Sequence, residues 1–306
     1  MTTTPSSSPH TTSRATGRPG TGIEIGTAVL AAVMSTIALL VGPAEEYARI
    51  FPPPWVTIIA VGLLLAALLV PRGRAGTTLG WAAAIFFLGG SGGVVLDAFR
   101  AFFWATGIPA GDFARVDWPG ATARAVSLAA ALITVHHTWR LGADAPRAVR
   151  PAPSTWGRRA LTGAAVALVV PYPLLKLVWW AQDAASPAAG PEHPFPAMEL
   201  LAFGTALVLV LLMLSSRTPR VLGRVLVVAG WGASMVLLSM GFLMVFGMLA
   251  QLTGVAGAEV RFTSGGASLM VLCVYGTWLM LGVVVLAATL RLMDRQLSDG
   301  RGGAVL

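Results

Sequence analysis

Eight long apolar stretches, separated by short arginine-bearing connections, constrain the fold of this chain more than any other feature. They lie at residues 25–42, 54–71, 79–97, 120–140, 160–181, 197–215, 221–250 and 267–291. A helix needs about 20 mainly apolar residues to cross the hydrocarbon core of a bilayer. Because a spanning segment must satisfy its own backbone hydrogen bonds, the sequence predicts an all-α integral membrane protein, a bundle of about eight transmembrane helices.

The composition of the chain agrees with a lipid environment. Of the 306 residues, 56% are hydrophobic and 11% are charged, whereas soluble domains carry about 25% charged residues. One soluble core could not bury that much apolar surface, so the composition excludes an ordinary soluble domain. The net charge of +8 comes from arginines in the connections, without a basic helix, so nucleic acid is not a predicted partner. The predicted partners are the lipid bilayer and, as a hypothesis, a small solute; the oligomeric state stays open.

Three segments divide the chain. Residues 1–22 are predicted to form a disordered cytoplasmic tail, since 17 of them are Thr, Ser, Pro or Gly. Residues 23–292 are predicted to form the transmembrane helical domain, and residues 293–306 a short cytoplasmic tail. The first apolar run can also be interpreted as a signal peptide cleaved after Ala44, which would leave seven spans. Its length and its long polar lead favour an uncleaved anchor.

The placement of basic residues predicts the orientation. With the N-terminus in the cytoplasm, the cytoplasmic segments hold 15 of the 21 basic residues and the outer segments hold five, while Lys176 lies within a span. Short cytoplasmic connections of membrane proteins are enriched in Lys and Arg. We therefore expect a multi-pass protein of the cell membrane with both termini in the cytoplasm.

Ionisable side chains near the apolar runs are the first candidates for a site, because a charge inside a bilayer is costly. Asp97 and Arg100 are three residues apart, so they share a helix face and can pair if the third span continues slightly further. Arg124, Lys176 and Glu199 also lie towards the outer leaflet. The hypothesis is an outward-facing polar pocket lined by Asp97, Arg100, Lys176 and Glu199. The alternative is that these side chains reach the headgroups or solvent separately.

The most distinctive segment lies in the fifth span. Pro171 and Pro173 remove backbone donors there and predict a helix kink. Lys176 and Trp179 follow the Tyr-Pro pair. Together with Tyr275-Gly276-Thr277-Trp278, this segment resembles multi-pass membrane proteins of uncharacterised activity that are common in high-GC Gram-positive bacteria. The resemblance implies the membrane class and no activity.

One motif points towards catalysis but has a simpler interpretation. Gly89-Gly90-Ser91-Gly92-Gly93 matches the G-x-S-x-G pattern of a serine nucleophile and looks like the Gly-x-Ser-Gly of rhomboid proteases. A base must lie within reach, but Ser91 and His136 are expected to differ in depth by roughly 12 Å. Glycines four residues apart favour close helix packing instead. The adjacent His136 and His137 point about 100° apart, which disfavours a shared metal.

The sequence thus supports a membrane protein whose activity it does not identify. The leading hypothesis is transport of a small solute through the outward-facing pocket. The alternative is a non-catalytic membrane component that acts in assembly or signalling through helix–helix contacts. An enzyme is the third choice, because no nucleophile and base are expected at one depth. We predict no catalytic residue, no metal site and no cofactor.

Overall fold

The computed structural model describes residues 21–70, 73–143, 155–184, 195–253 and 265–302, and over these ranges it contains helices and no strand. The long helices are α1 (Thr21–Val41), α2 (Trp55–Leu69), α3 (Arg74–Gly90), α4 (Val94–Thr106), α5 (Trp118–Ala143), α6 (Thr155–Val169), α7 (Pro171–Ala184), α8 (Ala197–Leu214), α9 (Arg220–Thr253) and α10 (Gly265–Gly302). Two short 3-10 helices, η1 (Glu46–Ile50) and η2 (Gly111–Ala114), lie in connections. Nearly all of the predicted tail 1–22 lies outside the described residues.

The helices match the dimensions of a membrane. Seven helical segments in the described ranges are long and apolar enough to cross one: Gly22–Val41, Arg74–Thr106, Trp118–Leu141, Gly157–Asp183, Ala197–Leu214, Arg220–Leu249 and Cys273–Leu297. Large apolar side chains point outward from them, with exposed fractions of 81% at Leu40 and 78% at Val221. Such a surface needs lipid as its solvent. The chain is therefore an all-α, multi-pass membrane protein. The remaining predicted span, 54–71, corresponds to α2, which has 15 residues and is shorter than the other seven.

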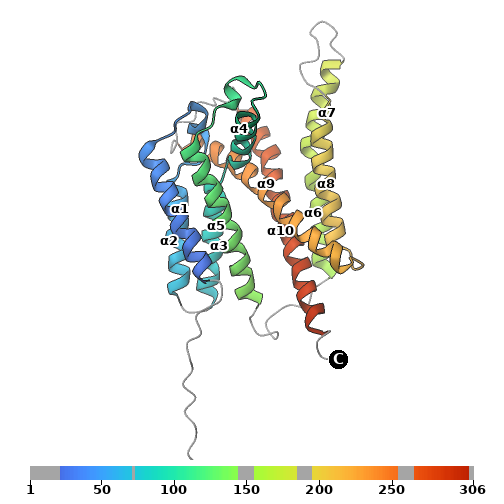
Figure 1. Cartoon of the computed structure of the whole chain (residues 1–306). Coiled ribbons are helices and arrows are strands. Elements are labelled where there is room, and N and C mark those ends of the chain that lie inside the picture. Colours follow the sequence, from blue (N-terminus) through green and yellow to red (C-terminus); the bar gives the residue numbers. More distant parts are fainter. Residues whose placement is uncertain (1–20, 71–72, 144–154, 185–194, 254–264, 303–306) are drawn as a thin grey trace, which may run out of the picture.

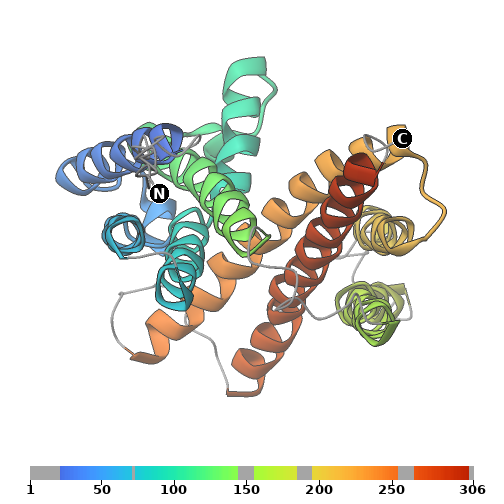
Figure 2. The ribbon, with the colours of Figure 1, turned by 90° about the horizontal axis from the view of Figure 1, so that it is seen from below.

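The helices form two groups that α9 joins (Figure 1). In the first group α2 packs on α1 and α3, and α5 packs on α1 and α3. In the second group α6 and α8 pack on each other and on α10. Helix α9 pairs along its length with α10 and also contacts α3, and Figure 2 shows this pair between the two groups. The start of α1 and the end of α10 lie at the same end of the molecule (Figure 1).

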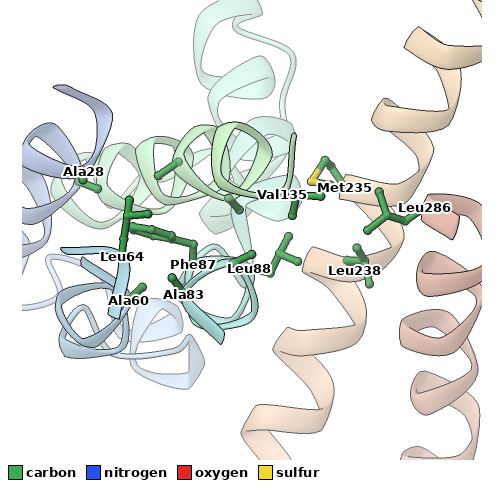
Figure 3. Close-up of a cluster of buried hydrophobic side chains, with 14 residues drawn as sticks. Ala28, Ala60, Leu64, Ala83, Phe87, Leu88, Val135, Met235, Leu238 and Leu286 are labelled. Atoms are coloured by element: carbon green, nitrogen blue, oxygen red, sulfur yellow. The ribbon is translucent and has the colours of Figure 1, made fainter. Parts of the chain in front are cut away.

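Small residues allow the first group to pack closely. Phe87 of α3 is fully buried at its centre, next to Leu64 of α2 and Leu88 (Figure 3). Alanines dominate the rest of the cluster and let neighbouring backbones approach. The cluster extends to Met235 and Leu238 of α9 and so includes the joining helix. The further buried members are Ala28, Ala31, Ala60, Ala83, Ala84, Ala130, Ala131, Val135 and Leu286.

The third predicted span is broken into α3 and α4 at the glycine-rich motif. Gly93 adopts φ +93°, a left-handed conformation that favours glycine. A side chain at Gly92 would come within 2.8 Å of Pro52, and one at Gly93 within 2.9 Å of Phe51. The glycines therefore make a tight turn against the η1–α2 connection. Helix α4 then continues to Thr106, so Asp97 and Arg100 are both helical, as an extended third span required.

Hydroxyl groups of α5, of α9 and of the turn itself satisfy carbonyls at this break. Ser127 of α5 donates to the carbonyl of Phe87 at 2.8 Å, and Ser91 donates to that of Leu88 at 2.8 Å. Ser239 of α9 donates to the carbonyl of Ser91 itself at 3.0 Å. Irregular backbone at membrane depth persists only where protein groups satisfy it in this way.

Two further parts of the chain differ from the simple spans that the sequence predicts. They are the region of the predicted kink and the C-terminal end. Helix α6 ends at Val169 and α7 begins at Pro171, so the fifth predicted span is interrupted directly before the two prolines. The amide of Leu174 donates to the carbonyl of Val170 at 3.0 Å across the interruption. Helix α10 continues to Gly302 and thus includes most of the segment 293–306 that was expected to form a tail.

Candidate functional site

A buried ion-pair network lies above the α3–α4 break. Arg124 of α5 directs its Nε to Oδ2 of Asp97 on α4 at 2.6 Å and its Nη2 to Oδ1 at 3.1 Å. The same Nη2 lies 3.5 Å from Oδ2 of Asp117. The exposed fractions are 6% for Arg124, 3% for Asp97 and 2% for Asp117. A bidentate contact between a guanidinium and a carboxylate is a strong and oriented ion pair, which suits a position that excludes water.

The start of α5 and two hydrogen bonds to the segment after α1 fix the position of Asp117. This residue directly precedes α5, where the helix dipole favours an anion. Its Oδ1 accepts a hydrogen bond from the amide of Ala44 at 3.3 Å, and its own amide donates to the phenolic oxygen of Tyr47 at 2.8 Å. A side chain at Gly120 would collide with the Asp117 carboxylate. The segment after α1 is therefore tied to the first turn of α5.

Tyr47 and Arg100 extend the network towards the surface. The Arg100 guanidinium carbon lies 3.6 Å from the ring centroid of Tyr47 and 4.4 Å from that of Phe113. Its Nη1 donates to the carbonyl of Asp112 at 3.2 Å. Burial raises the pKa of Tyr47 despite the hydrogen bond from the Asp117 amide, so Tyr47 stays a neutral phenol. Aromatic faces attract a guanidinium, which explains why Arg100 turns towards the rings.

Beside this network is a cavity of about 240 Å³. Arg124, Asp117 and Gly120 of the α5 side form part of its wall, and the end of α1 and the η1–α2 connection form the rest. Phe51 lies under the Arg124 guanidinium, whose carbon is 4.5 Å from the ring centroid. The remaining lining residues are Ala38, Gly42, Pro43, Ala48, Arg49, Pro52, Pro53 and Pro54. Consecutive prolines hold this wall rigid, because each fixes its own φ angle.

The four residues predicted to share one pocket separate into two pairs. Asp97 and Arg100 belong to the network above, and Asp97 pairs with Arg124 rather than with Arg100. Lys176 lies on α7 in the second group, with its Nζ 5.8 Å from the ring centroid of Tyr172 and 5.4 Å from that of Trp179. Glu199 of α8 interacts electrostatically with Tyr172. The two pairs are on opposite sides of the α9–α10 pair (Figure 1).

The aromatic rings around Tyr172 pack against it and form a cluster. Tyr172 lies 5.0 Å from Trp278 and 5.6 Å from Phe203 between ring centroids, and Tyr275 lies 5.7 Å from Trp278. These distances are those of directly contacting rings. The Tyr-Pro segment and the Tyr275–Trp278 segment, on which the family resemblance rests, therefore meet in one packing contact.

Sequence reasoning did not select Asp117, Tyr47 or the lining prolines for the site. One signal was available for Asp117, because it precedes Arg124 by seven residues and so lies on the same helix face two turns away. The position of Tyr47 depends on how the connection after α1 folds back, which no periodicity encodes.

Ser91 and His136 serve in packing. Ser91 is fully buried and its Oγ donates to the backbone of α3. The His136 ring packs against Trp139 and Trp231, with centroid distances of 6.0 Å and 6.4 Å. Within the described residues no three His, Cys, Asp or Glu side chains gather closely enough to hold a metal ion. No protein-family model matches this chain, and no curated protein or solved structure is significantly similar to it.

Proposed function

We propose that this membrane protein binds a small solute in the cavity beside Arg124 and carries it across the bilayer. The observation that supports the proposal is a buried, fixed ion-pair network in the wall of a cavity of about 240 Å³. Ligand sites in proteins are concave, mostly apolar, and contain a few oriented polar groups. Drug-sized ligands occupy about 300–1,000 Å³, so this cavity fits a smaller solute.

The chemistry of the wall indicates the kind of solute. Proline rings and Phe51 present apolar surface, while Asp117 and Arg124 present an acceptor and a donor at one edge. A small solute with a hydrocarbon part and one polar group matches both surfaces. The cavity also adjoins the α3–α4 break, and discontinuous helices are frequent at the binding sites of transporters.

The alternative function, a component acting through helix–helix contacts, predicts that substitutions on glycine faces, such as Gly89→Leu, have the largest effects. Gly89 faces Val56 and Phe242 of the same chain, at 3.7 Å and 3.9 Å from an added Cβ. Gly241 faces the backbone of Leu279. These glycine surfaces are used within the protein, which favours the solute proposal.

Filling the cavity is expected to abolish solute binding. Ala38 lines the cavity and is 5% exposed, so Ala38→Leu places three additional carbons in it. We expect at least one class in a panel of small amino acids, amines, carboxylates and polyols to raise the melting temperature of the wild-type protein, and none to raise that of Ala38→Leu. At a concentration 100 times the Kd, the stabilisation is about 2.7 kcal/mol.

Thr36→Leu is the matched control, because Thr36 lies on the same helix and is exposed to lipid. It should respond to the solute as the wild-type protein does. Uptake of the responding solute into proteoliposomes then separates transport from binding alone. A panel that stabilises neither wild type nor control would contradict a solute site, and binding without uptake would contradict transport.

The proposed orientation puts the cavity on the outer face of the cell membrane, with eight crossings and both termini inside. It can be checked by cysteine labelling in a Cys273→Ala background, because Cys273 is the one native cysteine. We expect Asp112→Cys in η2 to react with a membrane-impermeant maleimide in intact cells. Ser154→Cys should react only after lysis. The reverse pattern would invert the orientation, and labelling of both in intact cells would contradict the count of eight.

A further inference from the structure

A second buried charge cluster lies at the opposite end of the first helix group. Glu24, in the first turn of α1, is 1% exposed. Its Oε1 lies 3.0 Å from Nδ1 of His137 on α5, whose side chain is 18% exposed. A buried carboxylate in an apolar environment is strongly destabilising unless it is paired or protonated. His137 is thus the group whose contact allows Glu24 to stay ionised there.

Several polar atoms of the Glu24–His137 pair have no hydrogen-bond partner among the described residues. Among the described residues, neither carboxylate oxygen of Glu24 has a hydrogen-bond partner, and neither does the buried Nε2 of His137. The close approach of Nδ1 to Oε1 is therefore an ion-pair contact without hydrogen-bond alignment. A pair that served only to hold α1 on α5 would be expected to satisfy these atoms. Buried polar atoms without a partner are rare in native proteins, and a functional role is one of the reasons for them.

Among the described residues of the helices packed around the pair, few are ionisable. Helices α2 and α5 pack on α1, and α3 packs on α5. Helix α2 contains no ionisable residue. On α3 the one ionisable residue is Arg74, which is exposed, and on this end of α5 the others are His136 and Arg140. His136 packs against Trp139 and Trp231 and interacts electrostatically with the adjacent His137.

We propose that Glu24 and His137 form a proton-binding site within the membrane domain. In the loaded state the imidazole holds a proton on each nitrogen beside the carboxylate, and the pair has no net charge. Release of one proton from the imidazole leaves a neutral ring and a net charge of −1. The proton exchanges with the aqueous phase at this end of the molecule through His137, the more exposed partner. The site is distinct from the cavity beside Arg124 and does not depend on solute binding.

The energetic coupling between the two side chains should depend on pH. The attraction requires an ionised Glu24 and a protonated His137. It is lost when the imidazole gives up its proton, so it weakens as pH rises. A double-mutant cycle with Glu24→Gln and His137→Gln on the full-length protein, measured at pH 5.5 and pH 8, should show coupling at the lower pH and little at the higher.

His136→Gln is the matched control, because His136 is the adjacent histidine and lies outside the pair. Its coupling to Glu24→Gln should be small at both pH values. Histidine ¹⁵N spectra of the wild-type protein in nanodiscs provide a reading that needs no variant to fold well. One histidine signal, assigned by its loss in His137→Gln, should change reversibly from imidazolium to imidazole over this range. Coupling independent of pH, or a His137 signal that does not change, would overturn the proposal.

Discussion

Replacing Arg124 with methionine is expected to lower the free energy of unfolding by about 3–5 kcal/mol. The substitution keeps much of the side-chain volume but removes the positive charge between Asp97 and Asp117, which are 3% and 2% exposed. Each carboxylate would then be buried without a cation, which costs more than the loss of the contact itself. The measurement is equilibrium unfolding of the purified protein in bicelles.

Two further variants separate charge burial from simple disruption. Arg115→Met removes an arginine whose pair with Asp112 is exposed, so it should change stability by about 0–1 kcal/mol. Adding Asp97→Asn and Asp117→Asn to Arg124→Met removes the unpaired charges and should recover part of the loss. Equal effects of Arg115→Met and Arg124→Met would mean that the network does not stabilise the fold.

The positions of the spans could be predicted from sequence because hydropathy reports directly on solvation by lipid. The run 54–71 corresponds to α2 at Trp55–Leu69, and the run 221–250 lies within α9 at Arg220–Thr253. The turn between α3 and α4 could not be predicted. It depends on Gly93 in a left-handed conformation and on hydroxyls of Ser127 and Ser239, which are distant in sequence.

The candidate site, too, could be predicted from the sequence only in part. Hydropathy gives the depth of a residue in the membrane, and on that basis Asp97, Arg124 and Lys176 were singled out as charges next to apolar runs. It does not give the lateral position of each helix, so it could not indicate that Asp97 meets Arg124 while Lys176 lies beyond the α9–α10 pair. Glu24 was missed for a related reason. A charge in the first turn of a span is usually solvated, whereas the packing of neighbouring helices on α1 leaves Glu24 1% exposed.

The second substitution with a large expected effect lies in the α9–α10 contact, which joins the two groups of helices. An added Cβ at Gly241 of α9 would lie 2.6 Å from the backbone nitrogen of Leu279 on α10 and 2.7 Å from its Cα. Backbone atoms cannot move aside as a side chain tip can, so Gly241→Ala must separate the two helices. We expect the free energy of unfolding to fall by about 1–3 kcal/mol, the usual cost of overpacking, and to fall further for Gly241→Leu.

Gly247→Ala gives the matched comparison, since it lies on the same helix and an added Cβ meets nothing within 4 Å. There the gain in helix propensity should leave stability unchanged or raise it by about 1 kcal/mol. Because α9 contacts both α3 and α10, Gly241→Ala should also loosen the second group from the first. Cysteines placed across the α9–α10 contact, in the Cys273→Ala background, should therefore crosslink more slowly in Gly241→Ala than in Gly247→Ala. Identical stability and crosslinking in the two variants would show that this close approach does not hold the halves together.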